Sequence, residues 1–166
     1  MDEKERKKLK ENKNLFKKWA KRYDFFLFQF WMKGFQRIVE TEIQLKKETK
    51  LLDISCGTGE FLKRLEGKAE LTGVDYTEEM LIEARKKLKK ETLLLKADVH
   101  ELPFKGETFD YVICTEAFHH YYNQEKALKE MYRVVKEKGK VIIVDVNFFL
   151  PIIHRLFEKV EPGCIK

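Results

Sequence analysis

The sequence contains few cysteines and no long hydrophobic run. Its three cysteines are an odd number, without a CxxC pair or a metal-ligand spacing, so neither a disulfide framework nor a structural zinc site is expected. Its four histidines are scattered, and they predict no metal site. No stretch approaches the roughly 18 consecutive apolar residues that a membrane-spanning helix needs, and no secretory leader pattern is found. These absences favour a cytoplasmic protein.

The composition is that of one globular domain with a basic first segment. The 166 residues are 43% hydrophobic and 13% aromatic, which excludes a disordered chain and leaves room for a single core. Residues 1–22 carry ten Lys or Arg and four Asp or Glu, while the remaining residues carry 24 of each sign. The basic segment suits anionic lipid or nucleic acid, or it is simply a solvated helix face.

Short apolar runs bounded by turn residues alternate with amphipathic helical patterns. The runs predicted as strands are residues 51–54, 71–75, 92–96, 111–114 and 141–146. Helices are expected after the candidate N-caps Thr77 and Asn123. Strands that are apolar on both faces and separated by helices predict a parallel sheet covered on both sides. The predicted fold class is therefore α/β, with a doubly wound, Rossmann-like sheet.

The turn after the first predicted strand, LLDISCGTGEF (51–61), is the expected ligand site of such a sheet. Gly57 and Gly59 allow a sharp turn and a close approach of the backbone to a ligand. Leu62 stands where a dinucleotide-binding fingerprint has its third glycine. Asp53 precedes the loop, and its carboxylate would oppose a pyrophosphate but suit an ammonium or sulfonium. The loop therefore predicts a cationic ligand.

Two further carboxylates end the second and third predicted strands. Asp75 is placed to accept hydrogen bonds from both hydroxyls of a ribose. Asp98 is placed to accept from an adenine amino group, with Val99 packed on the ring. Each acid alone is also common in turns and caps. Three acids at successive strand ends, however, indicate a nucleoside that carries no phosphate.

The motifs in this order resemble those of the class I S-adenosylmethionine-dependent methyltransferases, over roughly residues 50–146. Besides the glycine loop, they are VDYTEEM, KADVHELPF, FDYVICTEAFHH and RVVKEKGKVIIVD. The resemblance implies S-adenosyl-L-methionine as the cofactor. It implies contacts to the methionine end, ribose, adenine and sulfonium from a set of loop and strand-end residues: Asp53, Ser55, Cys56, Gly57, Gly59, Asp75, Tyr76, Met80, Asp98, Val99 and Thr115.

The segment FKKWAKRYD (16–24) resembles the helix and Tyr-Asp pair that precede the core in the subgroup methylating quinone precursors and similar small molecules. The resemblance implies that Tyr23 closes over the cofactor. Alternatively, Phe16, Trp19 and Tyr23 are an apolar stripe packed on the sheet. A second stripe continues through residues 28, 31, 35 and 38, where Ile38 is the last member.

Nine of the chain's 21 aromatic residues fall between Phe16 and Phe35, more than the packing of one helix requires. The excess suits an aromatic lid over an apolar or aromatic small-molecule acceptor, or peripheral docking to a membrane in which that acceptor dissolves. RNA bases are a third possibility, but no nucleic-acid module accompanies the aromatics, so nucleic acid is not expected.

Methyl transfer to carbon or oxygen can require a base, and His119 and His120 follow the fourth predicted strand. We therefore expect His120 to be catalytic, or else to cap or pack beside the cofactor. No metal is expected. Glu116 is a candidate substrate contact.

The expected organisation is 1–49 as N-terminal helices forming a lid, 50–148 as the cofactor-binding core, and 149–166 as a C-terminal helix and tail. Methyltransferases of this class usually add strands after the fifth, so the sheet is expected to be shortened. Strand 141–146 would then be an edge covered by the C-terminal helix or by a second copy of the chain. The shortened sheet leaves two functions open: an active methyltransferase, or an inactive cofactor-binding partner subunit or relic. A nucleotide-dependent oxidoreductase is a more distant alternative.

Overall fold

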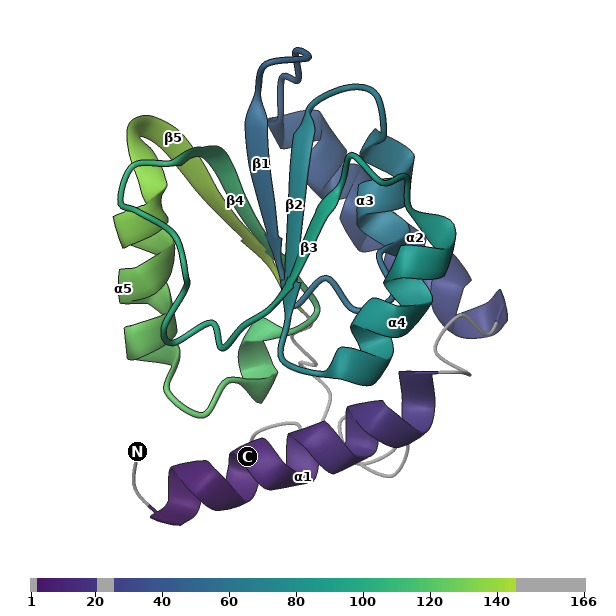
Figure 1. Cartoon of the computed structure of the whole chain (residues 1–166), viewed down its shortest axis with the longest axis vertical. Helices are drawn as coiled ribbons and strands as arrows, with labels where there is room; N and C mark the ends of the chain where they lie inside the picture. The colour runs from purple at the N-terminus through teal and green to yellow at the C-terminus, as the bar shows by residue number, and fades with distance from the viewer. Residues whose placement is uncertain (1–2, 21–25, 146–166) are drawn as a thin grey trace.

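The computed structural model describes residues 3–20 and 26–145, and its centre is a five-stranded parallel sheet (Figure 1). The strand order is β3-β2-β1-β4-β5. The strands are β1 (Lys50–Ile54), β2 (Glu70–Asp75), β3 (Leu93–Lys96), β4 (Phe109–Thr115) and β5 (Val135–Val144). The predicted doubly wound α/β fold is therefore confirmed.

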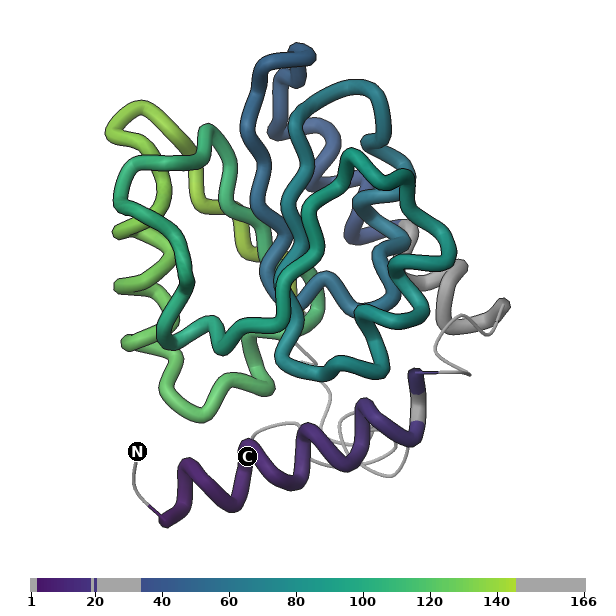
Figure 2. The backbone as a smooth tube through the Cα atoms, viewed as in Figure 1, coloured from purple at the N-terminus to yellow at the C-terminus, as the bar shows by residue number. Residues whose placement is uncertain are grey.

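Helices cover both faces of the sheet. The described helices are α1 (Glu3–Trp19), α2 (Phe26–Glu42), α3 (Glu60–Leu65), α4 (Glu78–Lys87), the short 3₁₀ helix η2 (Phe118–His120) and α5 (Gln124–Val134). Helices α2, α3 and α4 lie on one face, and α5 lies on the other (Figure 1). Helix α1 belongs to neither layer, because it runs across the end of the sheet, as the tube in Figure 2 shows.

Neighbouring residues in the central strands contribute to two separate hydrophobic cores, one on each face of the sheet. Leu51 and Ile113 are fully buried in the core shared with α2, α3 and α4, and Leu52 and Val112 are fully buried in the core on the α5 side. Side chains of successive strand residues point to opposite faces, so a strand between two helical layers is mostly apolar on both faces. This is why apolar residues predominate on both faces of the central strands, with Asp53 in β1 as a buried exception.

Strand β5 differs from its predicted bounds. It begins at Val135, directly after α5, where Val135 pairs with Phe109, and pairing resumes at Lys140 opposite Tyr111. The three extra residues form an irregularity that contains Gly139, at which a Cβ would lie 2.8 Å from a backbone oxygen of β4. Because the residues at this irregularity are mostly charged, the hydrophobic pattern of the sequence does not show where β5 begins.

Both predicted helix starts are found. The side chain of Asn123 accepts a hydrogen bond from the backbone N–H of Lys126 at 3.0 Å and caps α5. Thr77 precedes α4, but within the described structure its side chain makes no capping hydrogen bond. Leu81 and Ala84 lie on the inner face of α4 and are fully buried.

The predicted aromatic stripe on α2 is wrong at its last position. Ile38 is 52% exposed, whereas Val39 is fully buried against the sheet. The buried face of α2 therefore passes through Val39, one residue beyond the predicted stripe. Tyr23 and the predicted C-terminal helix lie outside the described residues. None of the described helices has the length and apolar character needed to cross a membrane.

Candidate active site

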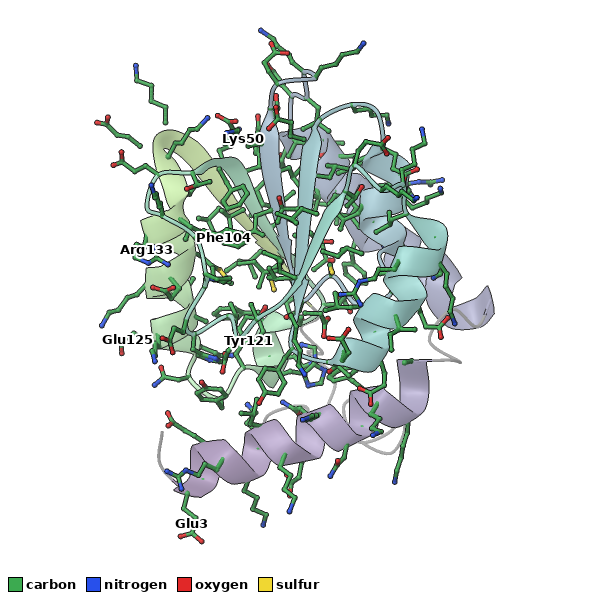
Figure 3. All side chains as sticks on the ribbon, in the orientation of Figure 1. Glu3, Lys50, Phe104, Tyr121, Glu125 and Arg133 are labelled. Atoms are coloured by element: carbon green, nitrogen blue, oxygen red, sulfur yellow. The ribbon has the colours of Figure 1, made fainter. Side chains whose placement is uncertain are left out.

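A crevice with both apolar and polar lining residues lies at the carboxyl ends of the strands, beneath α1. In Figure 3, Tyr121 marks this end of the molecule and Lys50 marks the opposite end. The crevice encloses about 810 Å³, including the part open to solvent. Strand β1 has β2 on one side and β4 on the other, so the order of strands reverses here. Ligands of open α/β sheets bind at such a switch point.

Most of the predicted site residues meet in this crevice. Its lining includes the predicted residues Ser55, Gly57, Asp75, Tyr76, Met80, Asp98, Val99, Thr115 and His120. Asp53, Cys56 and Gly59 are not part of the lining and lie behind the loop instead. Tyr23 lies outside the described residues, so its role stays a prediction.

Strained backbone marks the two strand ends that flank the crevice. Ser55, after β1, has φ of 59°, and Glu116, after β4, has φ of 56°. Non-glycine residues adopt this left-handed conformation at a cost, and such strain concentrates at functional sites. Gly59 has φ of 78°, and a Cβ there would lie 2.6 Å from the Leu88 Cδ1 atom. Glycine at this position lets α4 pack against the loop.

Asp75 connects the end of β2 to the glycine loop. One carboxylate oxygen accepts the Gly57 N–H at 2.9 Å, and the other accepts the Thr77 N–H at 2.8 Å. Burial raises the pKa of Asp75 to about 6, although these hydrogen bonds act to lower it. No described Lys or Arg forms an ion pair with Asp75, so its acceptor capacity is directed at the backbone and the crevice.

Asp53 lies in the core beneath the loop and is 2% exposed. Burial, and secondarily the charge of Asp75, raises the pKa of Asp53 to about 8. The predicted acid is therefore present, but at neutral pH it is mostly protonated in the described structure. This weakens the prediction that a fixed negative charge of Asp53 faces the ligand.

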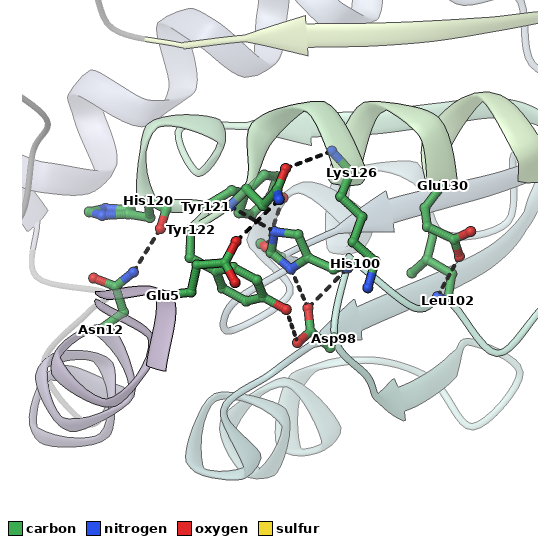
Figure 4. A network of polar contacts seen from close by, with 12 residues as sticks. Glu5, Asn12, Asp98, His100, Leu102, His120, Tyr121, Tyr122, Lys126 and Glu130 are labelled. Atoms are coloured by element: carbon green, nitrogen blue, oxygen red, sulfur yellow. Dashed lines mark hydrogen bonds and ion pairs between the residues drawn. The ribbon is translucent and has the colours of Figure 1, made fainter. Parts of the chain in front are cut away.

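Asp98, at the end of β3, is held by two aromatic neighbours (Figure 4). The Nδ1 atom of His100 lies 2.5 Å from one Asp98 oxygen, and the Tyr122 hydroxyl donates to the other at 3.0 Å. Burial would raise the pKa of Asp98, but the hydrogen bonds from His100 and Tyr122 outweigh it and lower the pKa below its usual value. Asp98 is thus a stable anion.

Tyr121 forms part of the crevice wall and was not predicted as a site residue. Its hydroxyl lies 3.0 Å from the Ser55 Oγ atom and 3.2 Å from the Cys114 Sγ atom. Burial raises the pKa of Tyr121 well above its usual value, so the phenol stays protonated. The hydroxyl joins the loops after β1 and β4.

Helix α1 closes one side of the crevice and supplies residues that were also missed. The Asn12 Nδ2 atom donates to the His120 backbone oxygen at 2.8 Å, and the Lys8 Nζ atom donates to the Tyr121 backbone oxygen at 3.0 Å. The Phe16 ring meets the His120 ring edge to face, with centroids 5.0 Å apart. The lining residues of α1 are Leu9, Asn12, Lys13 and Phe16. Their spacing of i, i+3, i+4 and i+7 was the available sequence signal.

The two candidate bases occupy different surroundings. His120 is 5% exposed and lines the crevice. The His119 ring is directed at Asp145 instead, with its Nδ1 atom 2.6 Å from a carboxylate oxygen, and it is not part of the lining. Among residues 3–20 and 26–145, no group of three metal-ligating side chains is found.

Comparison with known proteins identifies the family. Residues 52–143 match the family model described as "Methyltransferase domain". The chain is 34% identical over 139 residues to a demethylmenaquinone methyltransferase of Thermotoga maritima, covering 80% of this chain and 60% of the relative. It is 32% identical over 149 residues to the enzyme of that name from Bacillus cereus strain AH187, covering 81% and 61%. The chain thus spans about 60% of the length of these curated relatives.

Solved structures agree with this assignment. An S-adenosylmethionine-dependent methyltransferase of Thermotoga maritima, described as a possible histamine N-methyltransferase, superposes with a TM-score of 0.74 at 27% identity. The match covers 92% of this chain and 70% of that one. A methyltransferase from Aquifex aeolicus superposes with a TM-score of 0.60 at 28% identity, covering 66% and 63%.

The fold and the matched residues define a class I S-adenosylmethionine-dependent methyltransferase domain. The chain belongs to the methyltransferase domain family, and the curated relatives described above are named demethylmenaquinone methyltransferase. S-adenosylmethionine is the cofactor of this class. The crevice fits it, because the Asp75 carboxylate has no ion-pair partner among the described residues and the apolar Met80 and Val99 side chains lie beside it.

Proposed function

We propose that this chain binds S-adenosylmethionine in the crevice and transfers its methyl group to a small, lipophilic acceptor. One observation carries the proposal. Asp75 and Asp98 end two adjacent strands of one crevice, and neither forms an ion pair with a described Lys or Arg. Carboxylates accept hydrogen bonds from ribose hydroxyls and an amino group, and they oppose a phosphate.

Each part of the crevice has a proposed task. Asp75 holds the ribose hydroxyls, Tyr76 and Met80 pack on the adenine, and Asp98 and Val99 contact its edge. The loop residues Ser55 and Gly57, with Thr115 at the end of β4, hold the methionine end, and Asp53, Cys56 and Gly59 support the loop from behind. The bound S-adenosylmethionine supplies the methyl group as a sulfonium.

His120 is our proposed general base. Its ring lines the crevice, its position is tied to α1 through Asn12, and Phe16 packs against it. The acceptor atom gains a methyl group and loses a proton, which His120 takes. We expect His120→Ala to lower kcat by about 100-fold while the cofactor affinity changes little. An unchanged kcat would reduce His120 to a packing residue.

Calorimetric titration with S-adenosylmethionine and its demethylated product tests cofactor binding. We expect Asp75→Asn to weaken both ligands by about tenfold or more, because a buried acceptor becomes partly a donor. Asp110→Asn is the matched control, since Asp110 is a partly exposed carboxylate outside the crevice that pairs with Lys136. Equal affinity in the parent and Asp75→Asn would refute the proposed ribose contact.

The relatives' name suggests the acceptor. We propose demethylmenaquinone or a closely similar quinone precursor, which is apolar and aromatic, as the crevice and its Phe16 wall favour. The test is transfer of labelled methyl from S-adenosylmethionine to demethylmenaquinone in detergent micelles. Transfer to polar amines but not to the quinone would redirect the proposal, and cofactor binding with no transfer to any acceptor panel would favour an inactive partner subunit.

Helix α1 is our proposed lid, and it also carries the proposed membrane contact. Its exposed side chains outside the crevice lining are mostly cationic: Lys4, Arg6, Lys7, Lys10, Lys17 and Lys18, against Glu3, Glu11 and the neutral Asn14. A cationic helix over the crevice mouth would hold the protein on an anionic cytoplasmic membrane surface, where a lipophilic acceptor dissolves. Flotation with anionic vesicles, but not with neutral ones, is expected. Recovery wholly in the soluble fraction would refute the membrane contact.

A further inference from the structure

The best-defined polar network of the crevice surrounds Asp98 and extends beyond the residues assigned above (Figure 4). His100 approaches one carboxylate oxygen twice, through its backbone N–H at 2.9 Å and its Nδ1 atom at 2.5 Å. The Tyr122 hydroxyl donates to the other oxygen at 3.0 Å. All three residues line the crevice.

The hydrogen-bond partners assign the tautomer of His100. The backbone N–H of Asn123 donates to the Nε2 atom at 3.3 Å, so Nδ1 carries the ring proton and donates it to Asp98. The ring itself is 3% exposed and stacks on Tyr122, with centroids 3.6 Å apart and an interplanar angle of 23°. His100 is therefore held by its neighbours and in turn holds Asp98.

Most of the hydrogen-bond acceptor positions of the Asp98 carboxylate are already occupied. An ionised carboxylate offers about four lone-pair positions. The two donors of His100 and the hydroxyl of Tyr122 occupy three of them. One position remains, on the oxygen that Tyr122 contacts, and a ligand in the crevice that meets it must present a hydrogen-bond donor.

We propose that His100 and Tyr122 are positioning residues, which fix Asp98 as the acceptor for a single N–H donor and thereby select a 6-aminopurine over a 6-oxopurine. The proposal rests on the proposed binding of S-adenosylmethionine. An adenine amino group donates one hydrogen to the remaining position. The oxygen of a 6-oxopurine is an acceptor. It would face the remaining lone pair of the Asp98 carboxylate, with no hydrogen between the two oxygens.

The test compares two neutral nucleosides by calorimetry: S-adenosylhomocysteine and its deaminated analogue, S-inosylhomocysteine. For the parent protein, we expect the deaminated analogue to bind at least about tenfold more weakly. His100→Leu and Tyr122→Phe each remove one donor to Asp98, and we expect each to reduce this ratio to within about threefold. His100→Asn keeps a side-chain donor near the Nδ1 position, so it should restore the ratio.

The ratio separates positioning from a merely structural role. If His100 and Tyr122 only stabilise the fold, their variants will weaken both nucleosides equally, and an unchanged ratio overturns the inference while leaving cofactor binding intact. Equal binding of the two nucleosides by the parent also overturns it. A parent that binds neither nucleoside overturns both this inference and the proposed function. Thermal unfolding of each variant shows whether it is folded, and His100→Asn provides the measurement if His100→Leu is not.

Discussion

The stability of an Asp53→Asn variant relative to the parent protein should increase as the pH rises. Asp53 is 2% exposed, and burial raises its pKa from 3.8 to about 8. In the unfolded chain the group ionises near its ordinary pKa, so the folded state must keep a proton that the unfolded state has lost. Stability from this group is therefore complete below pH 3.8 and falls as the pH rises toward 8.

The magnitude follows from the size of this shift. Each pKa unit corresponds to about 1.36 kcal/mol, so at pH 7 Asp53 lowers the free energy of unfolding by about 4 kcal/mol. Asn cannot ionise and has nearly the same shape, although its amide needs an additional hydrogen-bond partner. We therefore expect a pH-independent offset, together with a stability gain that grows by about 3 kcal/mol between pH 5 and pH 7.

Urea and thermal unfolding, followed by circular dichroism at pH 5 and pH 7, measure this gain. For a domain of this size, 3 kcal/mol corresponds to roughly 6–12 °C in Tm. The control is Asp110→Asn, because the ion pair and hydrogen bonds of Asp110 lower its pKa, so its contribution does not change in this pH range. If the difference between Asp53→Asn and the parent is the same at both pH values, the reasoning about the buried carboxyl is wrong.

Two further predictions concern the glycine loop and the buried thiols. Gly59→Ala should lower the free energy of unfolding by about 1–3 kcal/mol, because φ is 78° and the new Cβ would meet Leu88 at 2.6 Å; an unchanged Tm would contradict this. Replacing the third cysteine in a Cys164→Ser variant leaves Cys56 and Cys114 as the two remaining thiols. We expect both to react with a thiol reagent only as fast as the protein unfolds, because burial raises the pKa of both thiols, that of Cys114 to about 12. Rapid reaction of the native protein would contradict this.

Local signals account for what could be predicted of the fold. The central strands are mostly apolar on both faces because each lies between two helical layers, and this pattern is visible in a window of a few residues. The irregular start of β5 was not visible, because it depends on pairing with β4 and on the close approach at Gly139. The buried face of α2 was predicted to pass through Ile38, but it passes through Val39. Only the packing of α2 against the sheet decides which of these two side chains is buried.

The sequence by itself determined the parts of the site that lie at strand ends, such as Gly57, Asp75 and Asp98. Their chemistry follows from local position, because parallel strands deliver their carboxyl ends to one edge. Tertiary structure alone decided that Asn12 meets His120 across 108 residues of chain. It also decided that Asp53 is protonated at neutral pH, since a pKa depends on burial and neighbouring charge, which only the folded chain defines.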